Sequence, residues 1–254
     1  MKDILEEIIA DKRAELTTTL QKRLSMKKRL AESDSGIIAE FKRKSPSKGW
    51  IHADARVEDV VPGYARGGAS AVSILTNEKY FGGSPEFIRR VRDIVPDLPI
   101  LRKEFIIDEY QLYEAKVIGA DAVLLIAADL SPSRYAELLR TAHALGLEVL
   151  LEVHAVEELS YLRAGVPDML GVNNRSLGTF HTDVRHSFDI AHEMQEAVAH
   201  LSEEDRPVLV SESGISDPKI VRRLREAGFR GFLIGECFMK ETDPGEALRD
   251  FINR

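Results

Sequence analysis

The sequence predicts an α/β protein, a (β/α)8 TIM barrel with an extra N-terminal helix. Eight short apolar segments recur along the chain, and a stretch with helix signals follows each of them. The apolar segments show little alternation, as expected of parallel strands buried on both faces. Eight such strands alternating with eight helices suggest a closed barrel. An open doubly wound sheet is the alternative, but no G-x-G-x-x-G follows the first strand, which weakens a dinucleotide-binding version.

The first 30 residues are predicted to be a helical extension packed on the barrel. Apolar residues repeat at helical spacing from Ile4 to Leu20. Acidic residues interrupt the many basic ones, so we expect the charged side to be a solvated face. No Pro/Ser/Gly-rich linker divides the chain, which favours a single domain over residues 1–254.

The expected strands are rich in leucine and β-branched residues. They cover residues 37–41, 71–75, 99–101, 122–126, 149–153, 169–172, 208–210 and 232–234. Four helices are expected to begin at a capping residue followed by proline: Ser84-Pro85, Ser131-Pro132, Asp217-Pro218 and Asp243-Pro244. Five glycines before the next strand are expected to end helices in the left-handed conformation: Gly68, Gly119, Gly146, Gly165 and Gly228.

Composition excludes several classes of protein. The net charge of −7 argues against a surface that grips nucleic acid or anionic lipid. The single cysteine, Cys237, excludes an intrachain disulfide and a paired-Cys zinc motif, and the histidines show no metal-ligand spacing. The longest apolar run, 122–128, is far shorter than the roughly 18 residues of a membrane span. We therefore expect a soluble, cytoplasmic protein without a metal and without nucleic-acid or membrane partners.

Function in such a barrel is expected at the carboxyl ends of the strands. Glu152 stands out because it lies between Leu151 and Val153, and a buried carboxylate without a partner costs several kcal/mol. We expect an acid/base pair in which a carboxyl of raised pKa lies close to a lysine. A purely structural ion pair is the alternative. The chemistry-bearing residues at the strand ends are Glu40, Lys42, Ser45, Lys103, Phe105, Glu152, Asn173, Arg175, Glu212 and Ser213.

The turns after the last two strands predict a phosphate site. Each contains a glycine, Gly214 or Gly235, and backbone N–H groups in these loops bind phosphate in many barrels. Glu236 could turn its side chain away and still donate its backbone N–H. The alternative is that each glycine is only a turn residue.

These residues lie in segments that resemble the indole-3-glycerol-phosphate synthase family. The longest match is IAEFKRKSPSKG at 38–49. The remaining matches follow in order at 73–76, 80–84, 101–108, 119–126, 151–154, 171–175, 211–215 and 233–236. The resemblance implies a (β/α)8 carboxy-lyase of tryptophan biosynthesis. Its substrate would be 1-(2-carboxyphenylamino)-1-deoxyribulose 5-phosphate, its products indole-3-glycerol phosphate, CO2 and water, and it would use no cofactor.

The resemblance also implies roles for single residues. Lys103 would be the general acid and Glu152 a base or charge stabiliser, with the division of roles among Glu152, Glu40 and Lys42 left open. Asn173 and Ser213 would join this catalytic group, and Arg175 and Glu212 would help to position the substrate. Phosphate would be held by Ser45, Gly214, Gly235 and the backbone of Glu236, and Phe105 would pack on the anthranilate ring.

Two other readings remain open at this point. A phosphoribosylanthranilate isomerase needs a Cys/Asp pair, but Cys237 follows the eighth strand, not the first, which argues against it. A catalytically inactive phosphosugar-binding module is the second, and the joint presence of Lys42, Lys103 and Glu152 argues against that. The only expected partner is the small phosphosugar-anthranilate substrate. We expect a monomer without a fused isomerase domain.

Overall fold

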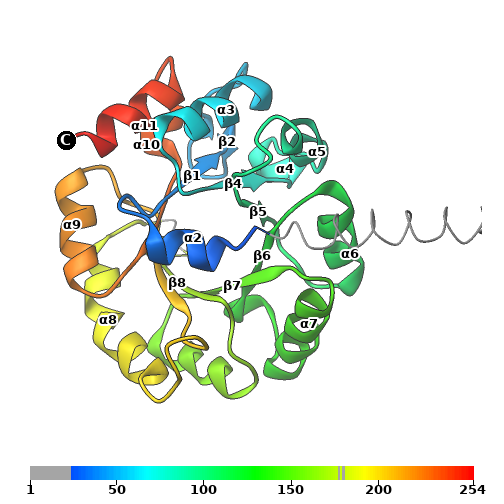
Figure 1. Ribbon diagram of the computed structural model, residues 1–254, viewed down its shortest axis with the longest axis vertical. Coiled ribbons are helices and arrows are strands. Elements are labelled where there is room, and N and C mark those ends of the chain that lie inside the picture. The colour runs from blue at the N-terminus through cyan, green and yellow to red at the C-terminus, as the bar shows by residue number, and fades with distance from the viewer. Residues whose placement is uncertain (1–23, 177, 179–180) are drawn as a thin grey trace, which may run out of the picture.

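A closed barrel of eight parallel strands forms the centre of the molecule (Figure 1). The computed structural model describes residues 24–176, 178 and 181–254. The strands lie in the order β1-β10-β9-β8-β7-β6-β5-β4, and β1 pairs with both β10 and β4 to close the barrel. Their bounds are β1 Ile37–Phe41, β4 Ala71–Leu75, β5 Ile100–Lys103, β6 Ala122–Ile126, β7 Glu148–Val153, β8 Met169–Asn173, β9 Val208–Glu212 and β10 Gly231–Ile234. The predicted TIM barrel is confirmed.

Every predicted strand is present, and the differences lie at the ends. Three strands are longer at their carboxyl end than the apolar pattern predicted, so β5 reaches Lys103, β8 reaches Asn173 and β9 reaches Glu212. Sheet pairing therefore holds these polar residues on the strands themselves and not on loops. A short antiparallel hairpin that was not predicted, β2 Lys44–Ser45 and β3 Gly49–Trp50, follows β1.

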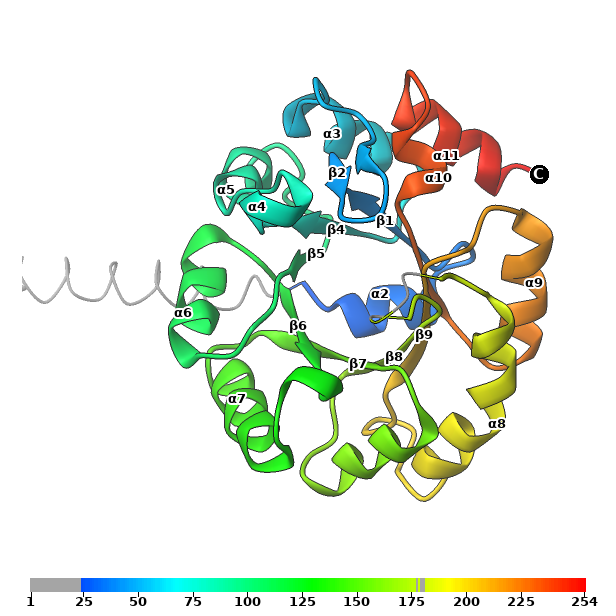
Figure 2. The same cartoon turned by 180° about the vertical axis from the view of Figure 1, so that it is seen from behind.

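Helices surround the barrel on its outside (Figures 1 and 2). The α-helices are α3 Val57–Gly67, α4 Glu78–Phe81, α5 Glu86–Arg92, α6 Glu109–Ile118, α7 Pro132–Ala144, α8 Arg185–Val198, α9 Pro218–Glu226, α10 Glu236–Met239 and α11 Pro244–Ile252. Two 3₁₀-helices, η1 Ala127–Asp129 and η2 Val156–Arg163, follow β6 and β7. The crossover after β7 is thus a 3₁₀-helix and not an α-helix.

Most of the predicted helix ends are confirmed. Ser131, Asp217 and Asp243 accept hydrogen bonds from the first turns of their helices, each with proline at the start. The helix predicted to begin at Ser84-Pro85 begins one residue later, since α5 starts at Glu86. Ser84 Oγ accepts a hydrogen bond from the backbone N–H of Glu86. Of the five predicted glycines, Gly68, Gly119, Gly146 and Gly228 follow helices with left-handed φ.

The prediction for Gly165 is wrong. Its φ lies outside the left-handed region, and the helix before it is η2. A Cβ added at this position would lie 2.5 Å from Leu139 Cδ2. Glycine is needed here because the chain passes close to α7, not because a helix ends in a left-handed turn.

One end of the barrel is closed by α2 Met26–Glu32, which lies in front of the strands in Figure 1. Met26 and Leu30 are fully buried against the side chains that fill the barrel. Glu148, at the start of β7, accepts hydrogen bonds from Ser25 Oγ at 2.6 Å and from Lys27 N at 2.9 Å. This part of the predicted N-terminal extension packs on the barrel, and residues 1–23 lie outside the described residues. The opposite end is left for the polar strand ends.

Within the part of the chain that the structure describes, no helix combines the length and the apolar character needed to cross a bilayer.

Candidate active site

Lys103 lies at the centre of the polar strand ends. Its Nζ is 2.8 Å from Glu152 Oε2 and 2.6 Å from Glu212 Oε2. The three side chains come from β5, β7 and β9, and their exposed fractions are 13%, 3% and 1%. The barrel therefore brings together one ammonium group and two carboxyl groups that are far apart in the sequence.

Burial and charge together give these three groups different protonation states. Burial opposes the charged form of Lys103, but the carboxylates of Glu152, Glu212 and Glu40 outweigh it and raise the pKa of the lysine. Burial also favours the neutral form of Glu152, but Lys103 and His154 lower the pKa of this carboxyl. At Glu212, burial and repulsion from Glu152 outweigh Lys103 and raise the pKa to about 8. At neutral pH the site therefore holds a charged lysine, an ionised Glu152 and a protonated Glu212.

Neighbouring groups fix the position of both carboxyls. Asn173 Nδ2 donates to Glu152 Oε1 at 3.0 Å, and Asn173 Oδ1 accepts from the Arg175 backbone N–H at 3.0 Å. A Cβ added to Gly171 would overlap Glu212 Oε1, so only glycine in β8 leaves room for this carboxyl. The need for glycine at this position was not predicted, because the strand pairing that creates the close approach is not visible in the sequence.

A second lysine–carboxylate pair lies beside the first. Lys42 Nζ is 2.5 Å from Glu40 Oε1, and both side chains are largely buried. A Cβ added to Gly235 would lie 2.6 Å from Glu40 Oε1, so Gly235 gives this carboxyl its space. This ion pair faces the cavities described next.

Two adjoining cavities occupy the mouth of the barrel. The larger, of about 620 Å³, contains Lys103, Glu152 and Glu212 on its floor, and Phe81 and Phe105 on its wall. The smaller, of about 420 Å³, lies over the ends of β9 and β10. The residues that line both are Glu40, Lys42, Arg175, Ser213 and Leu233. The two cavities form one site of the size that takes a small organic molecule.

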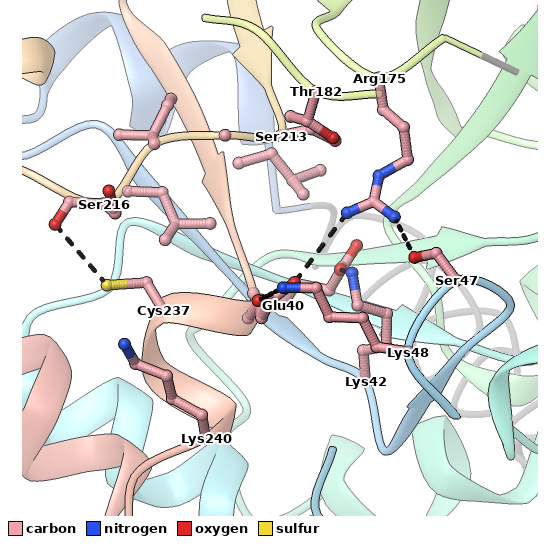
Figure 3. Close-up of a pocket in the computed structure, with 16 residues that line it drawn as sticks. Glu40, Lys42, Ser47, Lys48, Arg175, Thr182, Ser213, Ser216, Cys237 and Lys240 are labelled. Atoms are coloured by element: carbon pink, nitrogen blue, oxygen red, sulfur yellow. Dashed lines mark hydrogen bonds and ion pairs between the residues drawn. The ribbon is translucent and has the colours of Figure 1, made fainter. Parts of the chain in front are cut away.

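The smaller cavity has the features of an anion site. Ser213 and Gly214 adopt left-handed φ angles of 69° and 77°, and they lie across the cavity from Gly235. Lys42, Lys48, Arg175 and Lys240 line it, as Figure 3 shows. Glu40 and Glu236 also line this cavity, so four cations face two carboxylates, and this excess of positive charge around glycine-containing turns favours a bound phosphate group.

The side chain of Glu236 contacts two cations of the smaller cavity. It forms an ion pair with Lys48, and Arg175 Nη2 lies 4.0 Å from it. Burial raises the pKa of this carboxyl, but Lys48, Lys42 and Arg175 outweigh that effect and lower it. The neighbouring cations thus neutralise the one carboxylate that looked unsuited to this corner.

The remaining predicted residues also reach the site. Ser45 is buried on the wall of the larger cavity. Phe105 is 41% exposed at the rim, and its ring centroid is 6.3 Å from that of Phe81. Cavity residues that the sequence reasoning did not single out are Asn77, Tyr80, Phe81, Asp129, Lys48, Thr182 and Lys240. Lys48, Tyr80 and Phe81 lie inside matched segments. Asn77, Asp129, Thr182 and Lys240 follow strands without a chemical pattern that would distinguish them from loop residues.

Over residues 24–176, 178 and 181–254, no group of three or more His, Cys, Asp or Glu side chains is arranged to hold a metal ion.

Comparison with known proteins identifies relatives of this arrangement. A family model described as indole-3-glycerol phosphate synthase matches residues 2–251. An indole-3-glycerol phosphate synthase of Bacteroides thetaiotaomicron is 58% identical, with 99% of this chain and 98% of the relative covered. One from Carboxydothermus hydrogenoformans is 44% identical over 86% of this chain and 79% of its own length.

Among solved structures, thiamine phosphate pyrophosphorylase from Pyrococcus furiosus has a TM-score of 0.63. Its sequence identity is 16%, and the match covers 90% of this chain and 96% of the other. At this identity the likeness concerns the fold alone. The family match spans nearly the whole length, and the relatives agree with it. The chain therefore belongs to the indole-3-glycerol phosphate synthase family.

Proposed function

We propose that the protein is an indole-3-glycerol phosphate synthase, a carboxy-lyase of tryptophan biosynthesis. It would convert 1-(2-carboxyphenylamino)-1-deoxyribulose 5-phosphate to indole-3-glycerol phosphate, CO2 and water. The observation that carries the proposal is the placement of Lys103 between the carboxyls of Glu152 and Glu212, in a cavity that adjoins an anion corner. Family membership supports the same reaction.

The substrate would bind with its two ends in the two cavities. The phosphate would lie on the backbone of Gly214, Gly235 and Glu236, near Ser45 and Ser213. The anthranilate ring would pack in the larger cavity against Phe105 and Phe81. Lys42 and Arg175 line both cavities and would offset the charges of the phosphate and the carboxylate. Binding at both ends would hold the ring carbon against the carbonyl carbon of the sugar chain.

Ring closure would begin with proton transfer from Lys103. As the ring carbon that bears the carboxylate attacks the carbonyl carbon, Lys103 Nζ would give a proton to the carbonyl oxygen and relieve its developing negative charge. The new bond leaves an iminium on the substrate nitrogen. Loss of CO2 then returns the carboxylate's bonding electrons to the ring and this nitrogen, so the substrate supplies its own electron sink.

Dehydration would use the ionised carboxylate of Glu152. The hydroxyl leaves as water after it gains a proton, and Glu152 takes a proton from the carbon next to the nitrogen. The lowered pKa of Glu152 and its hydrogen bond from Asn173 keep the carboxyl ionised and aimed. Glu40 and Lys42 remain candidates for the second acid. Glu212, protonated at neutral pH, would orient Lys103 without adding a full negative charge.

The test is direct synthesis of the product. The purified protein is supplied with the carboxyphenylamino-deoxyribulose phosphate, and indole fluorescence is followed with time. Appearance of indole-3-glycerol phosphate is expected. If folded protein binds the substrate but forms no product, the chain is a phosphosugar-binding module instead. An isomerase is disfavoured further because burial raises the pKa of the Cys237 thiol and so opposes its action as a base.

Four further points belong to this proposal. We propose one domain over residues 1–254, a monomeric state and a cytoplasmic location. The small-molecule substrate is the proposed partner, and the family supports this choice.

A further inference from the structure

We propose that His154 supplies the active site with the proton that each turnover consumes, by passing it to Glu152 from a separate cavity on the far side of that carboxyl. This inference rests on the proposed function. It assigns a role to a buried histidine for which the ring-closure chemistry described above has no use.

The proposed reaction needs a net supply of protons. One proton goes to the carbonyl oxygen and a second to the hydroxyl that leaves as water, while the base recovers only one from carbon. The difference is one proton per turnover, because a carboxylate enters and neutral CO2 leaves. A proton must therefore reach the site from solvent in every cycle, while the substrate fills the mouth of the barrel.

The geometry places His154 on the path to the catalytic pair. It lies two residues beyond Glu152, so both side chains leave the chain on the same side. His154 Nε2 is 3.3 Å from Glu152 Oε1, while the other oxygen of Glu152 faces Lys103 Nζ at 2.8 Å. Glu152 therefore has a histidine at one oxygen and the proposed general acid at the other.

The ring nitrogens of His154 are not held by hydrogen bonds in the described part of the chain, although Nε2 lies near Glu152. Both of its nitrogens are buried, and neither makes a hydrogen bond within the described residues. Such unpartnered ring nitrogens are uncommon in native proteins and call for a physical explanation. An imidazole ring that takes a proton from one group and gives it to another cannot be held by a hydrogen bond to one of them alone. Rotation of the imidazole would carry a proton between Glu152 and the space behind it.

That space is a third cavity, of about 340 Å³. Asn173 and Ser176 line both this cavity and the larger one, and His154 and the exposed His181 line this cavity alone. The larger cavity, where the substrate would bind, does not include His154. A proton could therefore reach His154 from solvent while substrate blocks the other route.

Charged groups from several elements lie around His154. Glu152 lies on its own strand, Asp129 of η1 is near enough for their charges to interact, and Glu158 of η2 accepts from the His154 backbone N–H at 2.6 Å. His186 of α8 lies 2.9 Å from the His154 carbonyl oxygen, and Asp183 lines the same cavity. Carboxylates from β7, η1 and η2 therefore lie around this residue.

The proton transfer can be written in three balanced steps. The Nε2–H bond of the imidazolium breaks and an O–H bond forms on Glu152, leaving a neutral imidazole. Glu152 then gives that proton to Lys103 or to the leaving hydroxyl and becomes a carboxylate again. The imidazole turns toward the third cavity and takes a proton from water or from a buffer acid.

The experiment is chemical rescue of His154→Ala in a dilute, bulky buffer. We expect kcat to fall about tenfold or more, with little change in KM, as is typical when a proton-transfer group is removed. Added imidazole, a small acid that fits the third cavity, should raise kcat toward the wild-type value and then saturate. His154→Gln keeps the polarity but cannot carry a proton, so it should show the same loss.

His192→Ala, at an exposed position of α8, is the matched control and should respond like wild type. Circular dichroism and thermal melting identify any variant that is misfolded, and His154→Gln then carries the test. Wild-type kcat in both His154 variants, or a loss that imidazole does not move, would overturn the inference. Absence of product from the wild-type protein in the same assay would instead refute the proposed function, so the two failures are distinguishable.

Discussion

At the scale of single residues, the proposed chemistry depends on how Lys103 is held. A buried ammonium needs carboxylate partners, and Glu152 and Glu212 supply them at 2.8 and 2.6 Å. Those same partners raise the pKa of Lys103, so the lysine is charged before it meets substrate. A developing oxyanion on the substrate would be the first acceptor to compete for its proton.

Replacing Lys103 by methionine tests this role. Lys103→Met keeps much of the side-chain volume, and we expect kcat to fall about 1,000-fold, within the range for loss of a general acid. Folding should persist with reduced stability, because two buried carboxyls lose their counter-ion. Steady-state kinetics and urea unfolding measure both effects. Lys28→Met, at an exposed position of α2, is the control, and a Lys103→Met enzyme with near-normal kcat would contradict the assignment.

Glu152→Gln separates catalysis from binding. The amide keeps the shape of the carboxyl and can still accept from Asn173, but it cannot take a proton from carbon. We therefore expect kcat to fall by about 100-fold or more and KM to change much less. Steady-state kinetics with the carboxyphenylamino substrate give both constants. The reverse pattern, a raised KM with unchanged kcat, would make Glu152 a binding residue.

Glu212 predicts how stability changes with pH. Its pKa is raised from the ordinary 4.5 to about 8 by burial and by Glu152. The folded state thus binds its proton more tightly than the unfolded state does. The resulting stabilisation is fully present at pH values below the pKa of Glu212 in the unfolded state. It is lost as pH rises through the pKa of Glu212 in the folded state, with a slope of at most about 1.4 kcal/mol per pH unit.

The variant Glu212→Gln removes this titration. Between about pH 5 and about pH 9 its free energy of unfolding in urea should decline less than that of the wild type. Glu203→Gln, at an exposed position, should follow the wild-type curve. Parallel curves for wild type and Glu212→Gln would show that Glu212 titrates normally.

At the scale of elements, the barrel was predictable because its strands are continuous apolar runs. The predicted bounds of β1, β4 and β6 match those observed. The polar residues after the runs were also expected at one mouth, since parallel strands end on the same side. Sequence alone did not show that Lys103 sits between Glu152 and Glu212, because that depends on the register around the closed barrel.

Close approaches of the chain were the other feature that the sequence could not show. Gly165 was assigned to a helix end, whereas the structure uses it to pass Leu139. Gly171 and Gly235 make room for the carboxyls of Glu212 and Glu40 on neighbouring strands, and no local pattern marks either glycine for that purpose. A glycine motif tells where the backbone is free to bend, but not which side chain needs the space.

Gly235→Ala tests whether this space matters. The new Cβ would lie 2.6 Å from Glu40 Oε1, so the Glu40–Lys42 pair must shift. A displacement of this size near reacting groups costs up to about 100-fold in rate, and we expect kcat/KM to fall by roughly that factor. Gly178→Ala is the control, since its Cβ would meet no atom within 4 Å. An unchanged kcat/KM in Gly235→Ala would show that Glu40 tolerates displacement.

At the scale of the whole molecule, structure and chemistry occupy opposite ends of one barrel. The helix α2 closes one end with apolar contacts, and the cavities open at the other. A substitution at one end of the barrel is therefore separated from the other end by the packed interior of the barrel. This separation allows charge to be concentrated at the mouth of a protein whose overall charge is −7.

That local charge predicts a salt dependence opposite to what the net charge suggests. The proposed substrate carries a phosphate and a carboxylate, and the protein as a whole would repel it. Lys42, Lys48, Arg175 and Lys240 line the anion cavity, so the field at the mouth attracts it instead. We expect kcat/KM to fall several-fold as the sodium chloride concentration rises from about 0.01 to about 1 M, while kcat stays constant. The reason is screening, because the Debye length shrinks over this range from roughly 30 to roughly 3 Å.

Lys240→Gln should lower kcat/KM at low salt and flatten its salt dependence. Lys28→Gln removes an exposed charge from α2 at the other end and should leave both unchanged. If both substitutions lowered kcat/KM equally, the net charge and not the mouth would govern substrate capture.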